Sequence, residues 1–464
     1  MQYIENKTFD ELAVGDTAEL IRDLKTEDIK LLAILSGDTN PVHMDEEYVK
    51  SDMFQKVIAH GMWGGSLIST VLGTELPGPG TIYRNQSLSF RKPVSLGDRI
   101  TVRVTVTKKQ DIDHRITLAC ECVNQEGEVV IDGTAEVAAP TEKIRRPQTL
   151  LPEAHLHKTG AQHERLIAAT EGLNPIPTAV VHPCDTLSLT GAMEAAKKGL
   201  IIPVLIGPKN KILAAAHEAE CDIGNVEIID VPHSHAAAEK AVEMVREGKT
   251  ASIMKGKLHT DEIMEAVVHP TTGLKTERRI SHVFVLDVPH YPKPLFITDA
   301  AINIYPDLVD KRDIVQNAID LAHALGIEIP KAAILSAVET VYPKINSTVD
   351  AAALCKMSDR GQITGGLLDG PLAFDNAISK SAAEAKGISS IVAGNADILV
   401  APDLEAGNMI AKQLIYLAGA ESAGIVLGAR VPIILTSRAD GIFSRIASSA
   451  LAQLYTHYIR QKKL

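Results

Sequence analysis

Short apolar strands alternate with alanine-rich helical segments from about residue 161 to the end of the chain. This alternation constrains the fold most, because parallel strands joined by helices are covered on both faces and are therefore continuously apolar. It predicts an α/β region with parallel-type sheets. The region from residue 161 to the end of the chain is about as long as the 250–300 residues at which a single hydrophobic core stops growing, which predicts two lobes. The strand candidates are residues 178–183, 201–208, 226–232, 251–257, 282–288, 294–300, 332–338, 396–403 and 432–438.

The first 140 residues follow a different pattern, with helical segments first and alternating strands afterwards. Helices followed by an antiparallel sheet predict an α+β domain over residues 1–140. The segment from Pro140 to Gly160 carries three prolines and many charges with little periodicity. This composition predicts a linker at residues 141–160, which leaves residues 161–464 as the second domain.

The bulk properties exclude several classes of protein. The net charge is -11, with 47 Lys+Arg against 58 Asp+Glu, and basic residues gather only in a short C-terminal tail, so nucleic acid is not an expected partner. The N-terminus lacks the layout of a signal peptide, and no apolar run is long enough to span a membrane. The 5 cysteines form no CxxC pair. We expect a cytoplasmic protein without a disulfide framework.

The stretch LSGDTNPVH, residues 35–43, breaks a helix and places a carboxylate and an imidazole close together. Asn40-Pro41 is expected to end the helix, so that Asp38 and His43 converge on one water for general acid–base addition. At Gly61, the start of the next apolar helix, free backbone N–H groups could hold an oxyanion. The alternative is purely structural: Asp38 caps the helix end and His43 is a partly buried turn residue.

Three motifs together resemble the MaoC-like (R)-specific enoyl-CoA hydratases, which have a hot-dog fold: SGDTNPVH, then IAHGM with Ser66 and Ser69 downstream, then GTIYRNQSLSFRKPV. The resemblance covers about the first 140 residues. It implies that Asp38 and His43 activate the water that adds to a trans-2-enoyl-CoA. It also implies that the Gly61 N–H polarises the thioester carbonyl, that Ser69 supports the catalytic turn, and that this part dimerises.

Three stretches of the second domain place polar residues at strand ends or helix starts. They are MKGKLHT (254–260), with Lys255, Gly256 and Thr260; DGPLAFDNAIS (369–379), with Asp375 and Asn376; and IILTSRAD (433–440), with Ser437, Arg438 and Asp440. A lysine-glycine turn before a helix suits an anion, the second stretch suggests an acidic loop entering a helix, and arginine clamps phosphate with two bonds. The structural alternatives are an ordinary βα turn, a capped turn and a surface salt bridge, respectively.

In this order the stretches resemble the phosphate acetyltransferase/phosphate butyryltransferase family from about residue 160 to the end. Further matching pieces are RISHV from Arg279, ITDAAINIYP (297–306), AGNADILV (393–400) and PDLEAGN, which ends at Asn408. The MKG and SRAD forms look closer to the butyryltransferases. The resemblance implies two lobes around a cleft where acyl-CoA and orthophosphate exchange the acyl group.

The same resemblance assigns roles to individual residues. Arg438 would clamp phosphate and Ser437 would hydrogen-bond at the reacting centre, while further residues would line the binding pocket. These are Lys255, Gly256, Thr260, Arg279, Asp375, Asn376 and Asn408. The chain departs from the family pattern at Ser444, where a carboxylate is expected, and at Met264-Glu265, where an arginine is common. Whether Asp440 or another acid serves as the general base stays open.

These observations predict a fused enzyme: a hot-dog enoyl-CoA hydratase followed by a two-lobed α/β phosphotransacylase. Its substrates would be coenzyme A thioesters and orthophosphate, with no permanently bound cofactor, in a homodimer or higher homo-oligomer. The alternative is that one half, in the first place the transferase, is a catalytically weak acyl-CoA-binding or oligomerisation module. No metal is expected, since the His155-Leu-His157 and His233-Ser-His235 pairs lack the further ligands of a closed site.

Overall fold

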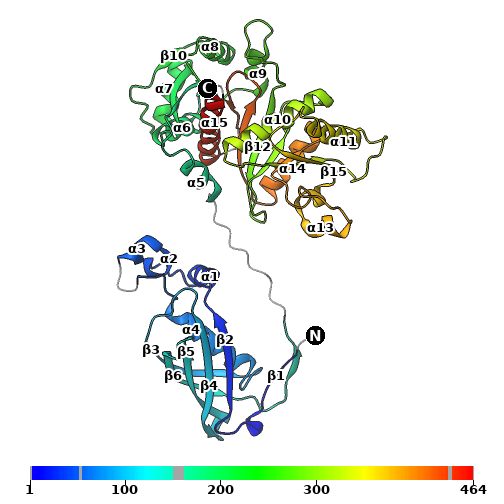
Figure 1. The fold of residues 1–464 in the computed structure, drawn as a ribbon. Helices are drawn as coiled ribbons and strands as arrows, with labels where there is room; N and C mark the ends of the chain where they lie inside the picture. The colour runs from blue at the N-terminus through cyan, green and yellow to red at the C-terminus, as the bar shows by residue number, and fades with distance from the viewer. Residues whose placement is uncertain (1–2, 52–54, 150–160, 437–440, 463–464) are drawn as a thin grey trace. The chain divides into compact units, whose positions relative to one another are not determined.

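The computed structural model describes residues 3–51, 55–149, 161–436 and 441–462. The chain divides into two compact units, Met1–His157 (unit 1) and Lys158–Leu464 (unit 2), which are described separately (Figure 1). Within the described ranges, no helix combines the length and the apolar character needed to cross a membrane.

Unit 1 is built on an antiparallel sheet. Its described helices are α1 (Thr26–Ser36), α2 (Pro41–Met44), α3 (Glu46–Lys50) and α4 (Gly61–Thr74), with short 3-10 turns at Phe9–Glu11 and Ile112–His114. Its described strands are β1 (Tyr3–Glu5), β2 (Thr17–Asp23), β3 (Ile82–Phe90), β4 (Arg99–Gln110), β5 (Arg115–Val123), β6 (Val129–Ala138) and β7 (Arg145–Pro147). The larger sheet has the order β2-β4-β5-β6-β3, which confirms the predicted α+β class. The predicted order, helices first and strands afterwards, was wrong, because β1 and β2 precede α1.

The core of unit 1 lies between α4 and one face of this sheet. In β4 and β5 buried and less buried residues alternate, as expected for strands with one face in the core. Cys120 and Cys122 are buried on that face, and burial raises the pKa of the Cys122 thiol to about 12. Both are therefore small core residues.

Two local features of unit 1 differ from the sequence prediction. Helix α1 ends at Ser36, before Asn40-Pro41 is reached, because Gly37 adopts a left-handed conformation with φ 76°. Pro41 instead begins the next helix, α2. Residues 145–147, inside the expected linker, form β7 and pair antiparallel with β1. This part of the expected linker consequently belongs to unit 1.

Unit 2 contains a single continuous mixed sheet. Its described strands are β8 (Ile176–Val181), β9 (Ile201–Gly207), β10 (Ile228–Asp230), β11 (Ser252–Lys255), β12 (Ser281–Asp287), β13 (Leu295–Thr298), β14 (Lys331–Leu335), β15 (Leu367–Leu372), β16 (Ile398–Val400), β17 (Glu421–Leu427) and β18 (Ile433–Ile434). Among the described residues the order is β10-β9-β8-β11-β18-β17-β12-β13-β16-β14-β15.

The strand directions divide this sheet into two lobes. The strands β10, β9, β8, β11 and β18 are parallel to one another and form the first lobe. The strands β13, β16, β14 and β15 are also mutually parallel and form the second lobe. Between them, β17 and β12 pair antiparallel with each other and with their lobes. The predicted parallel lobes are confirmed, and they run in opposite directions along one sheet.

Helices cover both faces of the sheet in unit 2. They are α5 (Ala161–Ala168), α6 (Thr186–Lys197), α7 (Lys209–Glu218), α8 (Ser234–Arg246), α9 (Thr260–Val268), α10 (Leu308–Ala324), α11 (Asn346–Asp359), α12 (Phe374–Ile378), α13 (Lys380–Ala385), α14 (Leu404–Tyr416) and α15 (Ile442–Lys462). One face carries a core that runs through both lobes, whereas the opposite face holds two separate clusters, one under α8 and α9 and one under α12 to α14.

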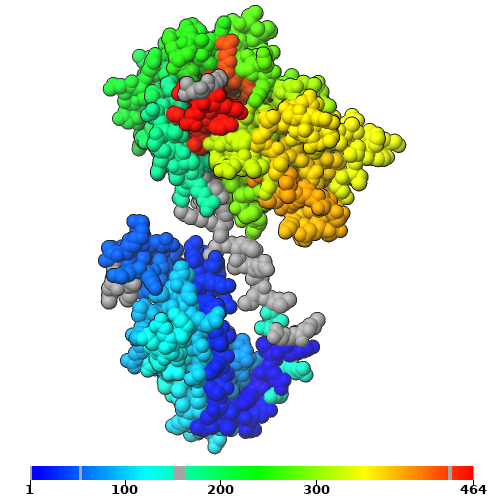
Figure 2. Space-filling model, in the orientation of Figure 1, coloured from blue at the N-terminus to red at the C-terminus, as the bar shows by residue number. Residues whose placement is uncertain are grey.

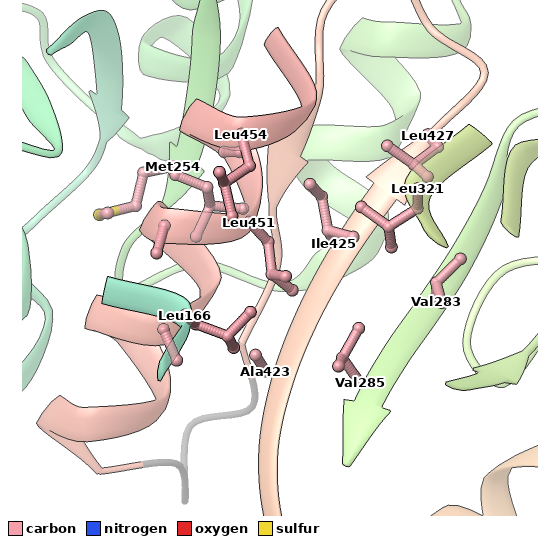
Figure 3. Close-up of a cluster of buried hydrophobic side chains, with 14 of the residues drawn as sticks. Leu166, Met254, Val283, Val285, Leu321, Ala423, Ile425, Leu427, Leu451 and Leu454 are labelled. Carbon is pink, nitrogen blue, oxygen red and sulfur yellow. The ribbon is translucent and has the colours of Figure 1, made fainter. Parts of the chain in front are cut away.

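The last helix holds the two lobes together. Leu451 and Leu454 of α15 belong to the same core cluster as Met254 of β11, Val283 of β12 and Ile425 of β17 (Figure 3). Helix α15 contacts α6 in the first lobe and α10 at the second, and its exposed end emerges between them, red in Figure 2. One continuous core cluster therefore spans both lobes of unit 2.

The stretch expected as an acidic Gly-Pro loop is a strand in the structure. Asp369 to Pro371 lie inside β15, and only the residues from Phe374 onward enter a helix, α12. The strand tolerates Pro371 because β15 is at the edge of the sheet, where a missing N–H breaks no ladder. The prediction of a loop was wrong for these residues.

Candidate active sites

In unit 1, the turn between α1 and α2 meets the start of α4. The exposed Asp38 lies in that turn, His43 lies on α2, and the buried His60 immediately precedes α4. One carboxylate oxygen of Asp38 and one ring nitrogen from each histidine lie within 4.8 Å of one another. The two imidazole rings are 3.9 Å apart between centroids, with an interplanar angle of 32°.

The hydrogen bonds of the two histidines fix which nitrogen carries the proton in the neutral ring. His43 Nδ1 is 2.8 Å from the carbonyl oxygen of Ile58, and His60 Nε2 is 3.1 Å from the carbonyl oxygen of Asp38. A carbonyl only accepts, so both of these nitrogens donate. The lone pairs are then on His43 Nε2 and His60 Nδ1, and His43 Nε2 is suited to take a proton from water.

The alternative, in which Asp38 caps α1, is not what the structure shows. The backbone of Gly37 closes α1, and Asp38 Oδ1 accepts instead from the N–H of Asn40 at 3.1 Å. The Asp38 carboxylate therefore stabilises the turn between α1 and α2.

A pocket of about 320 Å³ opens beside these groups. Its lining includes His43, His60 and Gly61, together with the apolar side chains of Ile58, Trp63, Phe90, Val94 and Ile131. A Cβ at Gly61 would lie 3.1 Å from the Phe90 ring, so glycine permits the close approach of the helix start to β3. The first N–H groups of α4 have no intrahelical acceptor and carry the positive end of the helix dipole.

The structure brings Asp38, His43 and Gly61 to one place but leaves Ser69 apart. Ser69 is exposed on α4, two turns beyond Gly61, and does not line the pocket of this single chain. Its supporting role stays a prediction.

In unit 2, Lys255 and Gly256 lie at the carboxyl end of β11, and Thr260 begins α9. Lys255 is 4% exposed, and Arg445 of α15, equally buried, donates from Nη1 to the Lys255 carbonyl at 3.5 Å. Two cationic residues are thus buried near the helix start that was predicted to bind an anion.

Gly256 lets the chain turn directly under the end of β8. Its N–H donates to the Val181 carbonyl at 2.9 Å, and a Cβ would lie 2.4 Å from that oxygen and 2.7 Å from the oxygen of His182. Backbone atoms cannot yield as a side chain does, so any substitution must displace the turn that carries Lys255.

We therefore expect Gly256→Ala to lower the free energy of unfolding by about 1–3 kcal/mol, as overpacking does, and to move Lys255. Urea unfolding of the full chain measures the loss. Gly73→Ala is the matched control, because a Cβ at Gly73 meets nothing within 4 Å. Equal stability of the two variants would contradict the close approach at Gly256.

Arg279 and Asn408 both hold the loop that follows β13. Arg279 Nε donates to Asn303 Oδ1 at 2.7 Å and lies 3.5 Å from Asp310, and Asn408 Nδ2 donates to the Ala300 carbonyl at 3.0 Å. The amide of Asn408 is thereby used within the fold. The half-exposed Arg279 guanidinium keeps its outer face toward solvent.

Asp375 and Asn376 lie on α12, after β15. Asp375 is exposed and 3.7 Å from Lys386. Asn376 is fully buried, and neither side-chain atom has a hydrogen-bond partner in the part of the chain that the structure describes.

The structure does not gather all the predicted binding residues of unit 2. Lys255, Gly256 and Thr260 follow a strand of the first lobe. Arg279 contacts the loop after β13, while Asn408 and the Asp375-Asn376 pair follow β16 and β15 of the second lobe. The strands of the two lobes run in opposite directions. The carboxyl ends of the first lobe's strands therefore lie at the opposite side of the sheet from the carboxyl ends of the second lobe's strands.

Ser437, Arg438 and Asp440 lie outside the described residues. The strand before them, β18, is parallel to β11 and therefore ends at the same edge as Lys255. Complete burial lowers the pKa of His282 in β12 to about 3, so this histidine is neutral near pH 7.

Two further residues at these sites were not predicted. His60 was noted only as part of the IAHGM motif and given no role of its own, although it immediately precedes Gly61. Arg445 had no signal in the sequence beyond its place in a long helix, since only the packing of α15 brings it to β11.

Comparisons with known proteins identify both parts of the chain. Residues 234–452 match the family model of the phosphate acetyl/butaryl transferases, and residues 13–126 match that of the MaoC-like domain. The chain is 63% identical over 295 residues to a phosphate acetyltransferase of Rhizobium meliloti, covering 64% of this chain and 93% of that protein. It is 43% identical over 270 residues to a phosphate butyryltransferase of Clostridium acetobutylicum, covering 58% and 90%.

An unliganded (R)-hydratase from Pseudomonas aeruginosa is also similar, at 42% identity and a TM-score of 0.33, covering 34% of this chain and 100% of that one. Of the two transferases, the acetyltransferase is the more similar, although the MKG and SRAD forms alone were expected to look closer to the butyryltransferases. The chain belongs to the phosphate acetyl/butyryl transferase family and carries a MaoC-like hot-dog domain before its two-lobed transferase domain.

Proposed function

We propose that this protein is a bifunctional acyl-CoA enzyme. Its N-terminal domain hydrates a trans-2-enoyl-CoA to the (R)-3-hydroxyacyl-CoA, and its C-terminal domain transfers an acyl group reversibly between coenzyme A and orthophosphate. Coenzyme A thioesters and phosphate are substrates, and neither reaction uses a resident cofactor. The domains are residues 1–140, extended by β7, and residues 161–464.

The observation that carries the hydratase is the convergence of Asp38 and His43 beside the start of α4. Asp38 and His43 Nε2 hold the water and remove its proton as the hydroxyl bonds to the β-carbon of the thioester. The proton returns to the α-carbon. The Gly61 N–H stabilises the negative charge that the thioester oxygen carries in between.

The pocket next to these groups suits an acyl chain. Its walls are formed by Trp63, Phe90, Val94 and Ile131, so the reacting end of the substrate would be polar and its tail apolar. At the rim, Arg91 is paired with Asp132, at 2.5 Å, and Lys92 with Glu128. A phosphate of coenzyme A would have to compete with these carboxylates.

In the transferase, a phosphate oxygen attacks the thioester carbonyl, and the coenzyme A thiolate leaves to give the acyl phosphate. Lys255 and Arg445 supply positive charge at the strand end, and we assign the phosphate clamp to Arg438 with Ser437 beside it. Asp440 is the candidate base in place of the carboxylate that the chain lacks at Ser444. The higher identity to an acetyltransferase favours acetyl as the acyl group.

A second candidate function is a transferase domain that binds acyl-CoA with little turnover, and Ser444 is the observation that favours it. Incubating the full chain with acetyl phosphate and coenzyme A separates the two. Formation of acetyl-CoA that increases linearly with enzyme supports the transferase. Calorimetric binding of coenzyme A without acetyl-CoA formation would establish the binding module instead.

The homo-oligomer remains a prediction for both domains. Light scattering of the purified full chain would give a mass at least twice that of the 49.8 kDa chain, whereas a monomeric mass would contradict it.

A further inference from the structure

The cluster of Asp38, His43 and His60 has the composition of a metal site as well as that of a proton-transfer site. We propose that these residues bind a divalent transition-metal ion, for which Zn²⁺ is the best match. Two imidazoles and one carboxylate, with one donor atom each within 4.8 Å of the others, form a donor set that such ions favour. No metal was expected from the sequence, in which His60 is separate from the stretch that holds Asp38 and His43.

Both histidines have a lone pair left for an ion. His43 Nδ1 and His60 Nε2 each donate to a backbone carbonyl, which leaves His43 Nε2 and His60 Nδ1 as the acceptors. His60 is 5% exposed, and within the described residues its Nδ1 has no hydrogen-bond partner. It does not cap α4 either. A buried acceptor without a donor is what a bound cation or an ordered water would satisfy.

The carbonyl partners also act as outer supports. A metal-binding histidine almost always donates its second nitrogen to a carbonyl, a carboxylate or water, which fixes the tautomer and the ring orientation. The Ile58 and Asp38 carbonyls serve this purpose for His43 and His60. The exposed Asp38 leaves one side of the cluster open, where water can complete the coordination.

The nitrogen-rich donor set selects the ion. Mg²⁺ and Ca²⁺ prefer oxygen ligands, whereas Zn²⁺, Co²⁺ and Ni²⁺ accept imidazole. The other described pair of this kind, His233 and His235, has its rings 6.2 Å apart and belongs to no group of three ligands in the described chain. His155 and His157 lie outside the described residues.

Metal binding would inhibit hydration, a consequence that rests on the proposed function. An ion bound to His43 Nε2 occupies the lone pair that must take the proton from water. The hydratase would lose activity with added Zn²⁺ and regain it with a chelator, while phosphate-dependent acyl transfer in the same sample would be unaffected.

The only tryptophan of the chain permits a direct test, because Trp63 is buried and lines the same pocket as His43 and His60. Paramagnetic Co²⁺ is titrated into the full chain, and both the tryptophan emission and the visible absorption of bound Co²⁺ are followed. We expect saturable quenching at one Co²⁺ per chain, reversed by Zn²⁺ but not by Mg²⁺.

Three variants and one control define the site. His43→Gln, His60→Gln and Asp38→Asn should each weaken Co²⁺ binding by about tenfold or more. His235→Gln, a change to an exposed histidine in unit 2, should leave it unchanged. Circular dichroism identifies any variant that fails to fold. The folded variants then decide whether Asp38, His43 and His60 bind the ion.

The result that overturns the proposal is an absence of saturable Co²⁺ binding, or binding that persists in every folded ligand variant. Crotonyl-CoA turnover is measured on the same preparations. Co²⁺ binding without turnover would contradict the proposed hydratase activity and support the metal site. Turnover without Co²⁺ binding would remove the metal site alone.

Discussion

Asp38→Asn abolishes hydration of crotonyl-CoA in the full chain, lowering kcat by about 10²–10⁴. An amide is a much weaker base than a carboxylate, so asparagine cannot help His43 to remove the proton from water. The fold should survive, because Asp38 is exposed and an asparagine oxygen can still accept from the N–H of Asn40. The loss of the enoyl thioester absorbance measures the reaction.

Asp45→Asn is the matched control for this change. Asp45 is an exposed carboxylate in the same segment, and it caps α3 by accepting from the N–H groups of Glu47 and Tyr48, a role that asparagine can also fill. It should keep normal turnover, and both variants should keep phosphate-dependent activity. If Asp38→Asn hydrates crotonyl-CoA at the normal rate, the assignment of the first site is wrong.

Arg438→Ala raises the KM for phosphate in the transferase reaction by about tenfold or more, since a hydrogen bond to a charged group contributes about 1.5–3 kcal/mol. A guanidinium forms two such bonds to one phosphate, so Arg438→Lys, which keeps the charge but not the fork, should show an intermediate KM. Initial rates over a series of phosphate concentrations give these values.

The control is Arg430→Ala, which removes an exposed arginine that precedes β18 in the sequence, whereas Arg438 follows it. It should leave the phosphate dependence unchanged. An unchanged KM in Arg438→Ala would mean that phosphate is held elsewhere, with Lys255 and Arg445 as the first positions to examine.

Local patterns predicted much of the fold. Apolar runs such as residues 201–208 marked the strands of both lobes, and the alternation in β4 and β5 marked the antiparallel sheet. Strand β17 was missed because Ser422, Ala423 and Gly424 weaken its apolar signal, and β15 because Pro371 suggested a loop. The opposite directions of the two lobes depend on pairings between distant strands, which no local pattern contains.

The candidate sites likewise divide into residues that local motifs predict and residues that depend on distant contacts. Asp38, His43 and Gly61 were predicted because they lie in short motifs. The partnership of His60 with the Asp38 turn was not, because it depends on how that turn folds back onto α4. Arg279 and Lys255 were expected in one pocket, but Lys255 ends β11 whereas Arg279 precedes β12, a strand that runs in the same direction as β11, so the two positions lie at opposite ends of these strands.

The measurement that tests the central claim most directly is incubation of the purified full chain with crotonyl-CoA, acetyl-CoA and phosphate, followed by mass spectrometry of the products. Two live sites on one chain predict the hydrated crotonyl thioester together with free coenzyme A and acetyl phosphate. Recovery of both thioesters unchanged, with neither water nor phosphate added, would contradict the account.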